Sequence, residues 1–237
     1  MTRRVVAIVG DHHAIGPRDL CGFSSRLYME LSSRDDTCWC VLGGGSSGGI
    51  RSVKDSLAQT IAEMVSYDVD EYDVIIWAGV GEAKSGGIPF DAWRGMLEHM
   101  ISMCVAADMN VGIVLPVIPP SDLIDKHMRR WFRRVRGVAI EVAKSKGIRS
   151  IDLSLDRQAF VDLYALSARA YQSISKDVAD QYFFTKRKAP RPADTEIIYK
   201  RKKPSNDKIS EPTKKTEDNT IVIMQPDRVK GSGRNDE

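Results

Sequence analysis

Residues 4–10 of this chain read RVVAIVG, a run of β-branched and small apolar residues that ends in glycine. An apolar run without polar alternation is typical of a strand that is buried on both faces of a parallel sheet. Three polar residues, Asp11, His12 and His13, follow this strand at once. Because parallel sheets bind ligands beyond the carboxyl ends of their strands, we expect these residues to lie near the candidate site.

Four further strand-like runs follow, and helix-like segments of ten or more residues separate most of them. The expected strands cover 37–42, 73–78, 111–117 and 149–153; the expected helices cover 23–32, 53–65, 90–107, 123–146, 158–170 and 176–184. Alternation of this kind predicts a parallel sheet with helices on both faces. We therefore predict a flavodoxin-like three-layer α/β/α fold with a five-stranded parallel sheet in the order 2-1-3-4-5 and right-handed crossovers.

The charge of the chain is divided unevenly along its length. The whole sequence has 35 Lys and Arg against 32 Asp and Glu, a formal net charge of +3. Residues 185–237 hold 14 of the basic and 9 of the acidic residues, which leaves 21 and 23 in residues 1–184. The end segment is also rich in Pro, Ser and Thr, a composition that buries too little apolar area to offset its ordering entropy. We predict an α/β domain over 1–184 and a disordered basic tail over 185–237.

Composition also bounds the compartment and the cofactors. We expect no membrane span, because no run of about eighteen apolar residues occurs, and the first ten residues do not read as a secretory signal. The four cysteines lie at 21, 38, 40 and 104, without metal-ligand spacing, which favours free thiols in a reducing compartment. We therefore expect a cytoplasmic or nuclear protein, not a secreted one, without metal or cofactor.

Several blocks of the sequence, taken in order, resemble those of SGNH (GDSL-type) hydrolases over about residues 4–184. The first strand runs into Gly-Asp-His-His at 10–13, where the family has Gly-Asp-Ser. The third expected strand ends in Gly-Val-Gly-Glu at 79–82, where the family has Gly-x-Asn-Asp. The remaining similar blocks are FSSRLY at 23–28, LGGGSSGG at 42–49 and VLPVIPP at 114–120.

The resemblance implies a serine nucleophile, an oxyanion site made of a glycine amide and an asparagine side chain, and a histidine with an aspartate three residues before it. In this chain His12 stands at the serine position and Gly81 at the asparagine position. The expected Asp-x-x-His around 170–177 has no histidine, and none occurs after His127. Only the glycine block, at Gly44 or Gly45, is intact, so the sequence predicts a degenerate catalytic site.

Two interpretations of His12 remain open. It could serve as a nucleophile, or form an acid/base pair with Glu82, in an active esterase or phosphoesterase with a rearranged site. Alternatively, His12 and His13 are polar loop residues of a vestigial pocket, and the domain is a binding or interaction module. We expect no metal on Asp11, His12 and Glu82, because the scattered histidines show no ligand spacing.

Residues 126–136, KHMRRWFRRVR, predict a helix with one basic and one apolar face. The basic stripe consists of Lys126, Arg129, Arg130, Arg133 and Arg134. The apolar face consists of Ile124, Met128, Trp131, Val135 and Val138. The stripe is either a solvated charged face or a surface for an anionic partner, such as nucleic acid or an acidic protein.

The tail carries two basic clusters that are twelve residues apart, and together they resemble a bipartite nuclear localisation signal. The clusters are Lys186 and Arg187, then Lys200, Arg201, Lys202 and Lys203. Such a signal would bind a nuclear import receptor and would place the protein in a eukaryotic cell, or in a virus or mobile element that lives there. A structural protein of such an element, with a tail that orders only in the assembly, is a third possibility.

Overall fold

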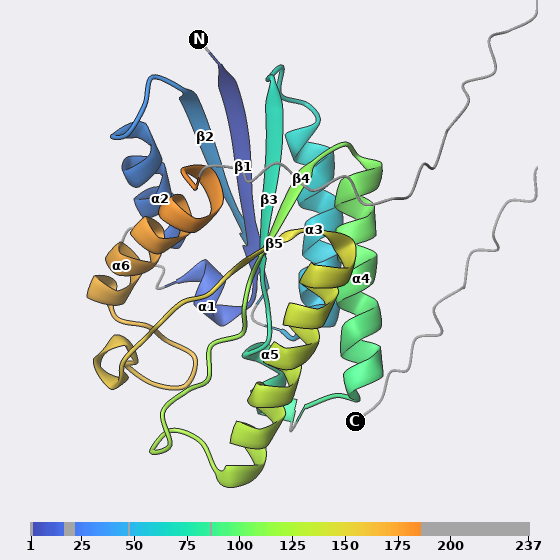
Figure 1. Cartoon of the computed structure of the whole chain (residues 1–237), viewed down its shortest axis with the longest axis vertical. Helices are drawn as coiled ribbons and strands as arrows, with labels where there is room; N and C mark the ends of the chain where they lie inside the picture. Colours follow the sequence, from blue (N-terminus) through green and yellow to red (C-terminus); the bar gives the residue numbers. More distant parts are fainter. Residues whose placement is uncertain (1, 17–21, 47, 86, 186–237) are drawn as a thin grey trace, which may run out of the picture. The chain divides into compact units, whose positions relative to one another are not determined.

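The structure is a computed structural model that describes residues 2–16, 22–46, 48–85 and 87–185. Five parallel strands form one sheet in the order β2-β1-β3-β4-β5, which confirms the predicted topology (Figure 1). The strands are β1 (Arg3–Gly10), β2 (Cys38–Gly45), β3 (Glu71–Trp77), β4 (Asn110–Val114) and β5 (Arg149–Ile151).

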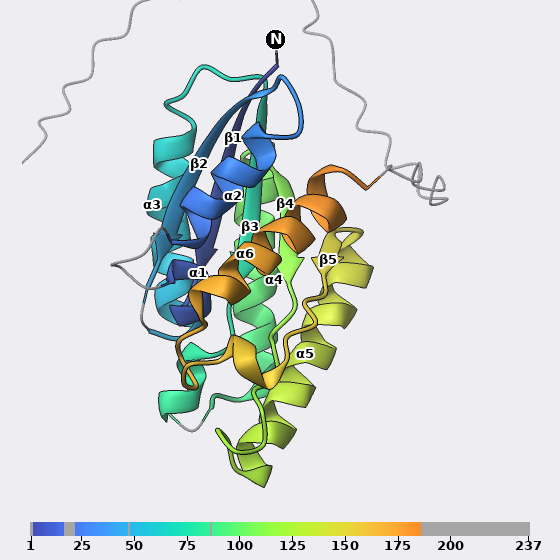
Figure 2. The same cartoon turned by 90° about the vertical axis from the view of Figure 1, so that its left-hand side faces the viewer.

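Helices cover both faces of the sheet (Figures 1 and 2). The helices α2 (Phe23–Ser32) and α6 (Ala168–Val178) pack on one face, whereas α3 (Ile50–Met64), α4 (Phe90–Ala106) and α5 (Lys126–Lys146) pack on the other. Side chains alternate along β1, so Val5, Ala7 and Val9 enter the core under α3, α4 and α5, while Val6 and Ile8 enter the core under α2 and α6. This two-sided burial explains why the five residues after Arg4 in this run, Val5–Val9, are all apolar.

The expected helix at 158–170 is wrong, and the helix expected at 176–184 begins earlier, at Ala168. The 3-10 turn η2 (Arg157–Ala159) is followed by a loop, then by α6, which continues into the π-helical turn η3 (Ala179–Phe183). Asp162 accounts for the loop, because its Oδ1 accepts hydrogen bonds from the amides of Tyr164 and Ala165 at 2.7 and 2.8 Å. A carboxylate that binds backbone amides two and three residues ahead favours a turn over a helix.

The glycine-rich loop, expected from residue 43, begins at residue 46 because β2 is longer than predicted. Gly43, Gly44 and Gly45 pair in register with Ile8, Val9 and Gly10 of β1. The predicted tail lies, apart from Thr185, outside the described residues, and so do all six residues of the predicted nuclear localisation signal. Within the described ranges no helix is both long and apolar enough to span a membrane.

The last residue of β1 lies in close contact with backbone atoms. A Cβ atom on Gly10 would lie 2.1 Å from the carbonyl oxygen of Trp77 and 2.4 Å from the Cβ of Ala14. The amide of Asp11 also donates to the Trp77 carbonyl, at 3.1 Å. Glycine is therefore required where β1 passes β3 and turns into the short helix α1 (His12–Ile15).

We predict that Gly10→Ala lowers the free energy of unfolding by more than about 2 kcal/mol, because the added methyl group meets backbone atoms that cannot move alone. The control is Gly95→Ala in α4, where an added Cβ has no atom within 4 Å. That change should raise stability by about 0.5–1 kcal/mol, the helix preference of alanine over glycine. Urea unfolding of both variants measures the difference, and equal stabilities would contradict the close packing at Gly10.

Candidate functional site

Asp11 joins the ends of two strands at the carboxyl edge of the sheet. It follows β1 directly, and its Oδ2 accepts hydrogen bonds from the amides of Gly79, Val80 and Gly81 at 2.7, 2.7 and 3.0 Å. Those amides belong to the segment after β3 that leads into the 3-10 turn η1 (Gly81–Ser85). One carboxylate thus connects two of the sequence blocks that resemble SGNH hydrolases, Gly-Asp-His-His at 10–13 and Gly-Val-Gly-Glu at 79–82.

The environment of Asp11 favours its protonated form. The residue is buried, and its Oδ1 has no hydrogen-bond partner among the described residues. Burial raises the pKa of Asp11 to about 7, against the lowering effect of the three amides, and the nearby Glu82 carboxylate raises it further. A carboxyl group with a pKa near neutrality at this edge is able to hold or release a proton.

The two histidines after Asp11 have different environments. His12 is half-buried, and its ring centroid lies 5.0 Å from that of Tyr164. His13 is buried, and its Nε2 lies 3.0 Å from the carbonyl oxygen of Leu163, so this nitrogen carries the proton and donates. Burial lowers the pKa of His13 to about 4, so its ring is neutral at physiological pH. His13 is therefore a packing residue that fixes the loop before α6.

Glu82 lies at the start of α3 rather than at an open surface. It is buried, and its Oε1 accepts a hydrogen bond from the amide of Ile50, the first residue of that helix. A carboxylate at a helix N-terminus is stabilised by the unpaired amides and the helix dipole. Burial nevertheless raises the pKa of Glu82. The pairing of Glu82 with His12 stays a prediction.

Backbone atoms occupy the space beside Gly81, the residue at the asparagine position. A Cβ atom on Gly81 would lie 2.2 Å from the carbonyl oxygen of Gly48 and 3.0 Å from the Cα of Gly49. Gly49 in turn packs on the Glu82 side chain, because its own Cβ would lie 2.3 Å from Oε1. An asparagine side chain therefore does not fit at residue 81 unless the loop before α3 moves.

The glycine block forms one wall of a groove of about 460 Å³. The described residues that line it are Ala14, Ile15, Ser24, Gly43, Gly44, Gly45 and Ser46. The amide of Ser46 donates to the Gly10 carbonyl at 3.1 Å, and the hydroxyl of Ser46 accepts from the Gly48 amide at the same distance. The structure places Gly44 and Gly45 at the end of strand β2. The oxyanion role predicted for them stays a prediction.

The predicted position of the catalytic histidine needs a correction. Residues 170–177, where Asp-x-x-His was expected, lie inside α6, so the loop just before the last helix covers 152–167 instead. This loop contains no histidine either. Two of its acidic side chains bind backbone amides: Asp156 accepts from Ala159, and Asp162 accepts from Tyr164 and Ala165. The shift in position therefore leaves the chain without a histidine for this role.

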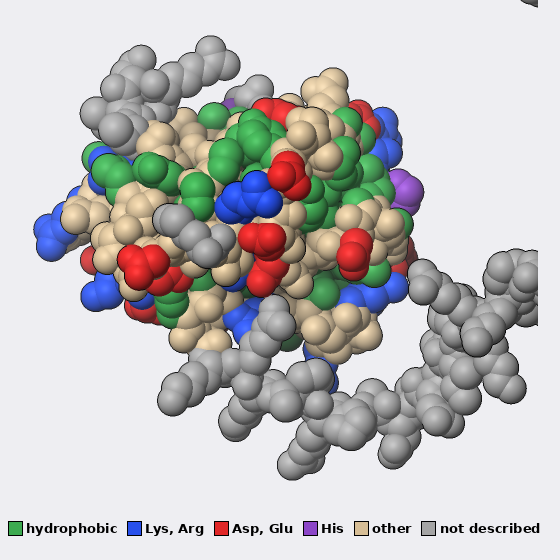
Figure 3. Space-filling view, turned by 90° about the horizontal axis from the view of Figure 1, so that it is seen from above, with side chains coloured by type: hydrophobic (Ala, Val, Ile, Leu, Met, Phe, Trp, Pro, Cys, Tyr) green, Lys and Arg blue, Asp and Glu red, His purple; other side chains and the backbone are tan. Residues whose placement is uncertain are grey.

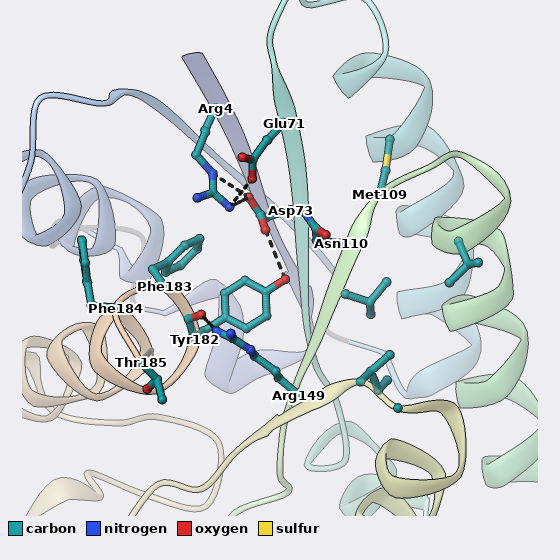
Figure 4. A pocket seen from close by; sticks show the side chains of 14 residues that line it. Arg4, Glu71, Asp73, Met109, Asn110, Arg149, Tyr182, Phe183, Phe184 and Thr185 are labelled. Atoms are coloured by element: carbon teal, nitrogen blue, oxygen red, sulfur yellow. Dashed lines mark hydrogen bonds and ion pairs between the residues drawn. The ribbon is translucent and has the colours of Figure 1, made fainter. Parts of the chain in front are cut away.

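A second cavity, of about 620 Å³, lies at the opposite, amino edge of the sheet, and the sequence patterns did not predict it (Figure 4). Arg4 contacts Asp73 at 2.7 Å and Glu71 at 2.9 Å, and the Tyr182 hydroxyl donates to Asp73 Oδ1 at 3.2 Å. Arg149 donates to the Tyr182 carbonyl. The sequence feature that could have indicated this cluster is the charged residue that begins each of two apolar strand runs, Arg4 in RVVAIVG and Asp73 in DVIIWA.

The charges at the amino edge neutralise one another. Burial raises the pKa of Asp73 although Arg4 lowers it, and the pKa of Tyr182 is raised well above its usual value, chiefly by burial. Seen from this edge, basic and acidic side chains lie next to one another (Figure 3). A Cβ on Gly112 would meet the Tyr182 ring at 2.5 Å, which shows how closely η3 packs on β4. The cluster anchors the end of the described chain on the sheet.

The predicted basic stripe lies on the outer face of α5. Lys126, Arg130, Arg133 and Arg134 are exposed, and Arg129 is half-buried. Trp131 and Val135 are buried in the core, whereas Ile124, Met128 and Val138 are partly buried against it. The structure thus separates the two faces as the helical periodicity predicts.

We predict that Asp11→Asn reduces the dependence of stability on pH. With a pKa of about 7 in the folded state and 3.8 as its ordinary value, Asp11 binds its proton more tightly when folded. Its contribution to stability is therefore present at low pH and is lost as the pH rises from about 4 through 7, by up to about 1.4 kcal/mol per unit. Urea unfolding at several pH values measures this slope.

Comparison with the wild-type chain cancels the opposite contribution of His13, whose pKa is lowered. The matched control is Asp122→Asn, because Asp122 is exposed and its pKa is lowered by Arg157. That variant should not reduce the decline of stability between pH 4 and 7. An Asp11→Asn variant with the wild-type pH dependence would show that Asp11 is ionised throughout this range.

No family model and no curated protein matches this chain. Solved structures do: a lipolytic protein of the G-D-S-L family from Veillonella parvula has a TM-score of 0.61 at 14% identity and covers 76% of this chain and 98% of its own. A lipase/acylhydrolase from Enterococcus faecalis has a TM-score of 0.59 at 17% identity, covering 75% and 94%. An acetyl xylan esterase from Geobacillus stearothermophilus has a TM-score of 0.60 at 14% identity, covering 78% and 97%. The chain therefore has the fold of SGNH (GDSL-type) hydrolases.

Proposed function

We propose that this chain is a catalytically degenerate SGNH-type domain that serves as a binding or interaction module. We propose that the basic helix and the tail bind nucleic acid or an acidic protein surface. We also propose that the tail binds a nuclear import receptor. An assembly of a virus or mobile element is the proposed setting, in the cytoplasm or nucleus. The fold supplies the scaffold, and the site residues support the loss of hydrolysis.

The observation that carries the proposal is the backbone packing at Gly81. Hydrolysis by the SGNH mechanism needs a side-chain donor there to stabilise the oxyanion, and loss of one such donor lowers the rate by about a hundredfold or more. In this chain the Gly48 carbonyl oxygen occupies the place of a Cβ at that position. His12 replaces the nucleophilic serine, and the sequence has no histidine after His127. Loss of the nucleophile, the donor and the base together leaves little beyond background.

The second candidate is an active esterase or phosphoesterase with a rearranged site. The observation in its favour is the pair of buried carboxyl groups, Asp11 and Glu82, both with raised pKa values, at the edge where parallel sheets bind ligands. In this mechanism His12 would attack the substrate or transfer a proton, and the glycine block would stabilise the oxyanion. The same raised pKa values also follow from burial alone, as at Asp73.

We predict that the full wild-type chain and its His12→Ala variant hydrolyse p-nitrophenyl acetate at the same rate as a matched control variant. The control is His99→Ala, which removes an exposed histidine of α4, because any surface imidazole hydrolyses this activated ester slowly. Equal rates for the wild type and both variants, measured by release of p-nitrophenol, would support the binding module. A rate that falls only with His12→Ala would overturn the proposal and establish the rearranged hydrolase.

A further inference from the structure

The basic stripe of α5 is held rigidly by the opposite face of the same helix. Six side chains of α5 are buried in the core on the sheet: Trp131, Phe132, Val135, Ala139, Val142 and Ala143. The Asp125 side chain caps the helix by accepting from the Met128 amide at 2.7 Å, and Gly147 ends it with a left-handed φ of 65°. The stripe residues therefore project from a fixed backbone, which lowers the entropy cost of binding.

The stripe is not neutralised by its neighbours in the fold. Among the described residues no ion pair involves Lys126, Arg129, Arg130, Arg133 or Arg134. Other arginines nearby are paired: Arg94 with Glu141, Arg136 with Asp152, and Arg157 with Asp122. Glu141, Asp152 and Asp122 thus contact cations beside the stripe, and the Asp125 carboxylate binds the Met128 amide.

Two details prepare the stripe for an anionic ligand. The guanidinium carbon of Arg134 lies 4.2 Å from the centre of the Phe90 ring, so the ring orients this group without neutralising it. The Nε of Arg129 is shielded from solvent and has no acceptor among the described residues. A shielded N–H group without an acceptor costs free energy, which an anion bound to the Arg129 guanidinium would recover in part.

The position of the stripe along the helix also costs stability. All five residues lie in the first nine positions of α5, and the first turn contains no acidic residue. Cations in the first turn of a helix, here Lys126 and Arg129, oppose the helix dipole by about 0.3–1 kcal/mol each at the surface. The Asp125 cap offsets part of this cost, because its carboxylate lies at the same helix end and binds the Met128 amide.

We infer that the stripe of α5 binds the phosphate backbone of nucleic acid. This inference rests on the proposed function and names the partner of the binding module. From Lys126 to Arg134 the helix rises about 12 Å, a length over which duplex DNA carries about seven phosphate charges. Four of the five residues are arginines, whose planar guanidinium groups bind phosphate oxygens in a bidentate manner.

The composition of the surface favours nucleic acid over an acidic protein. Protein interfaces contain an apolar centre with a polar rim. Ile140 is the exposed large apolar residue of α5, and it lies beyond the stripe, six positions after Arg134. A surface made of cations alone matches a ligand that is recognised through its charge, and phosphate contacts of this kind position the nucleic acid without reading its sequence.

The test measures binding of the full chain to a fluorescein-labelled mixed-sequence RNA and to a DNA duplex, by fluorescence anisotropy over a range of salt concentrations. The variant is Arg130→Gln with Arg133→Gln. The matched control is Lys144→Gln with Lys146→Gln, which removes the same charge from exposed residues in the last turn of the same helix. Circular dichroism melting checks that each variant folds as the wild type does.

We expect the stripe variant to bind about tenfold more weakly, and its slope of log affinity against log salt to be smaller by about two, one for each lost phosphate contact. The control should keep the wild-type slope and affinity. The inference is overturned if the wild type does not bind, or if the stripe variant and the control lose affinity equally. It is likewise overturned if both variants bind as the wild type does, because binding would then belong to other residues. It is also overturned if polyglutamate competes as well as unlabelled RNA, which would indicate an acidic protein partner.

These outcomes are separate from the ester assay. An inactive chain that does not bind nucleic acid would retain the degenerate-site proposal but lose this partner. A chain that binds through the stripe and also hydrolyses esters through His12 would retain the surface and lose the degenerate site. Each result therefore identifies which of the two proposals has failed.

Discussion

The carboxylate of Asp11 is the group on which the carboxyl edge of the sheet depends. One of its oxygens accepts three successive amides from the segment after β3, and its main-chain carbonyl accepts from Ala14 and Ile15 in α1. These bonds fix the end of β1, the start of α1 and the entry to η1 relative to one another. The pKa of Asp11 is nevertheless raised, because burial of the carboxyl group raises it more than the three amides lower it.

Around this carboxylate, close backbone and side-chain contacts fill the carboxyl edge of the sheet. Gly81 packs against Gly48 and Gly49, Glu82 binds the first amide of α3, and His13 binds the loop before α6. Each contact is close and buried, so none of these groups is able to change without movement of its neighbours. On the proposal of a degenerate site, a serine at residue 12 would not by itself give hydrolysis, because a Cβ at residue 81 meets the Gly48 carbonyl and no histidine follows His127.

The binding surface that we propose lies on the exposed side of α5. Helix α5 uses its apolar side to close one face of the sheet, and this leaves its cationic side in solvent. The amino edge shows the contrasting arrangement, because Arg4 there is neutralised by Asp73 and Glu71. The buried Asp73 is thus paired with a cation, whereas the largely exposed stripe of α5 makes no ion pair among the described residues. This difference is the physical basis for assigning function to the stripe.

The sequence by itself determined the sheet and its order, because the two-sided burial of parallel strands requires apolar runs such as RVVAIVG and DVIIWA, and it determined the two faces of α5 through helical periodicity. It also located the replaced positions His12 and Gly81 at strand ends. It did not determine the helix boundaries after residue 157, because Asp162 outweighs helical periodicity by binding nearby amides. Only the tertiary structure decided that His13 is a packing residue, that Glu82 caps α3 and that a side chain at residue 81 has no space. Those roles depend on contacts between segments far apart in the chain, and local sequence patterns carry no information about such contacts.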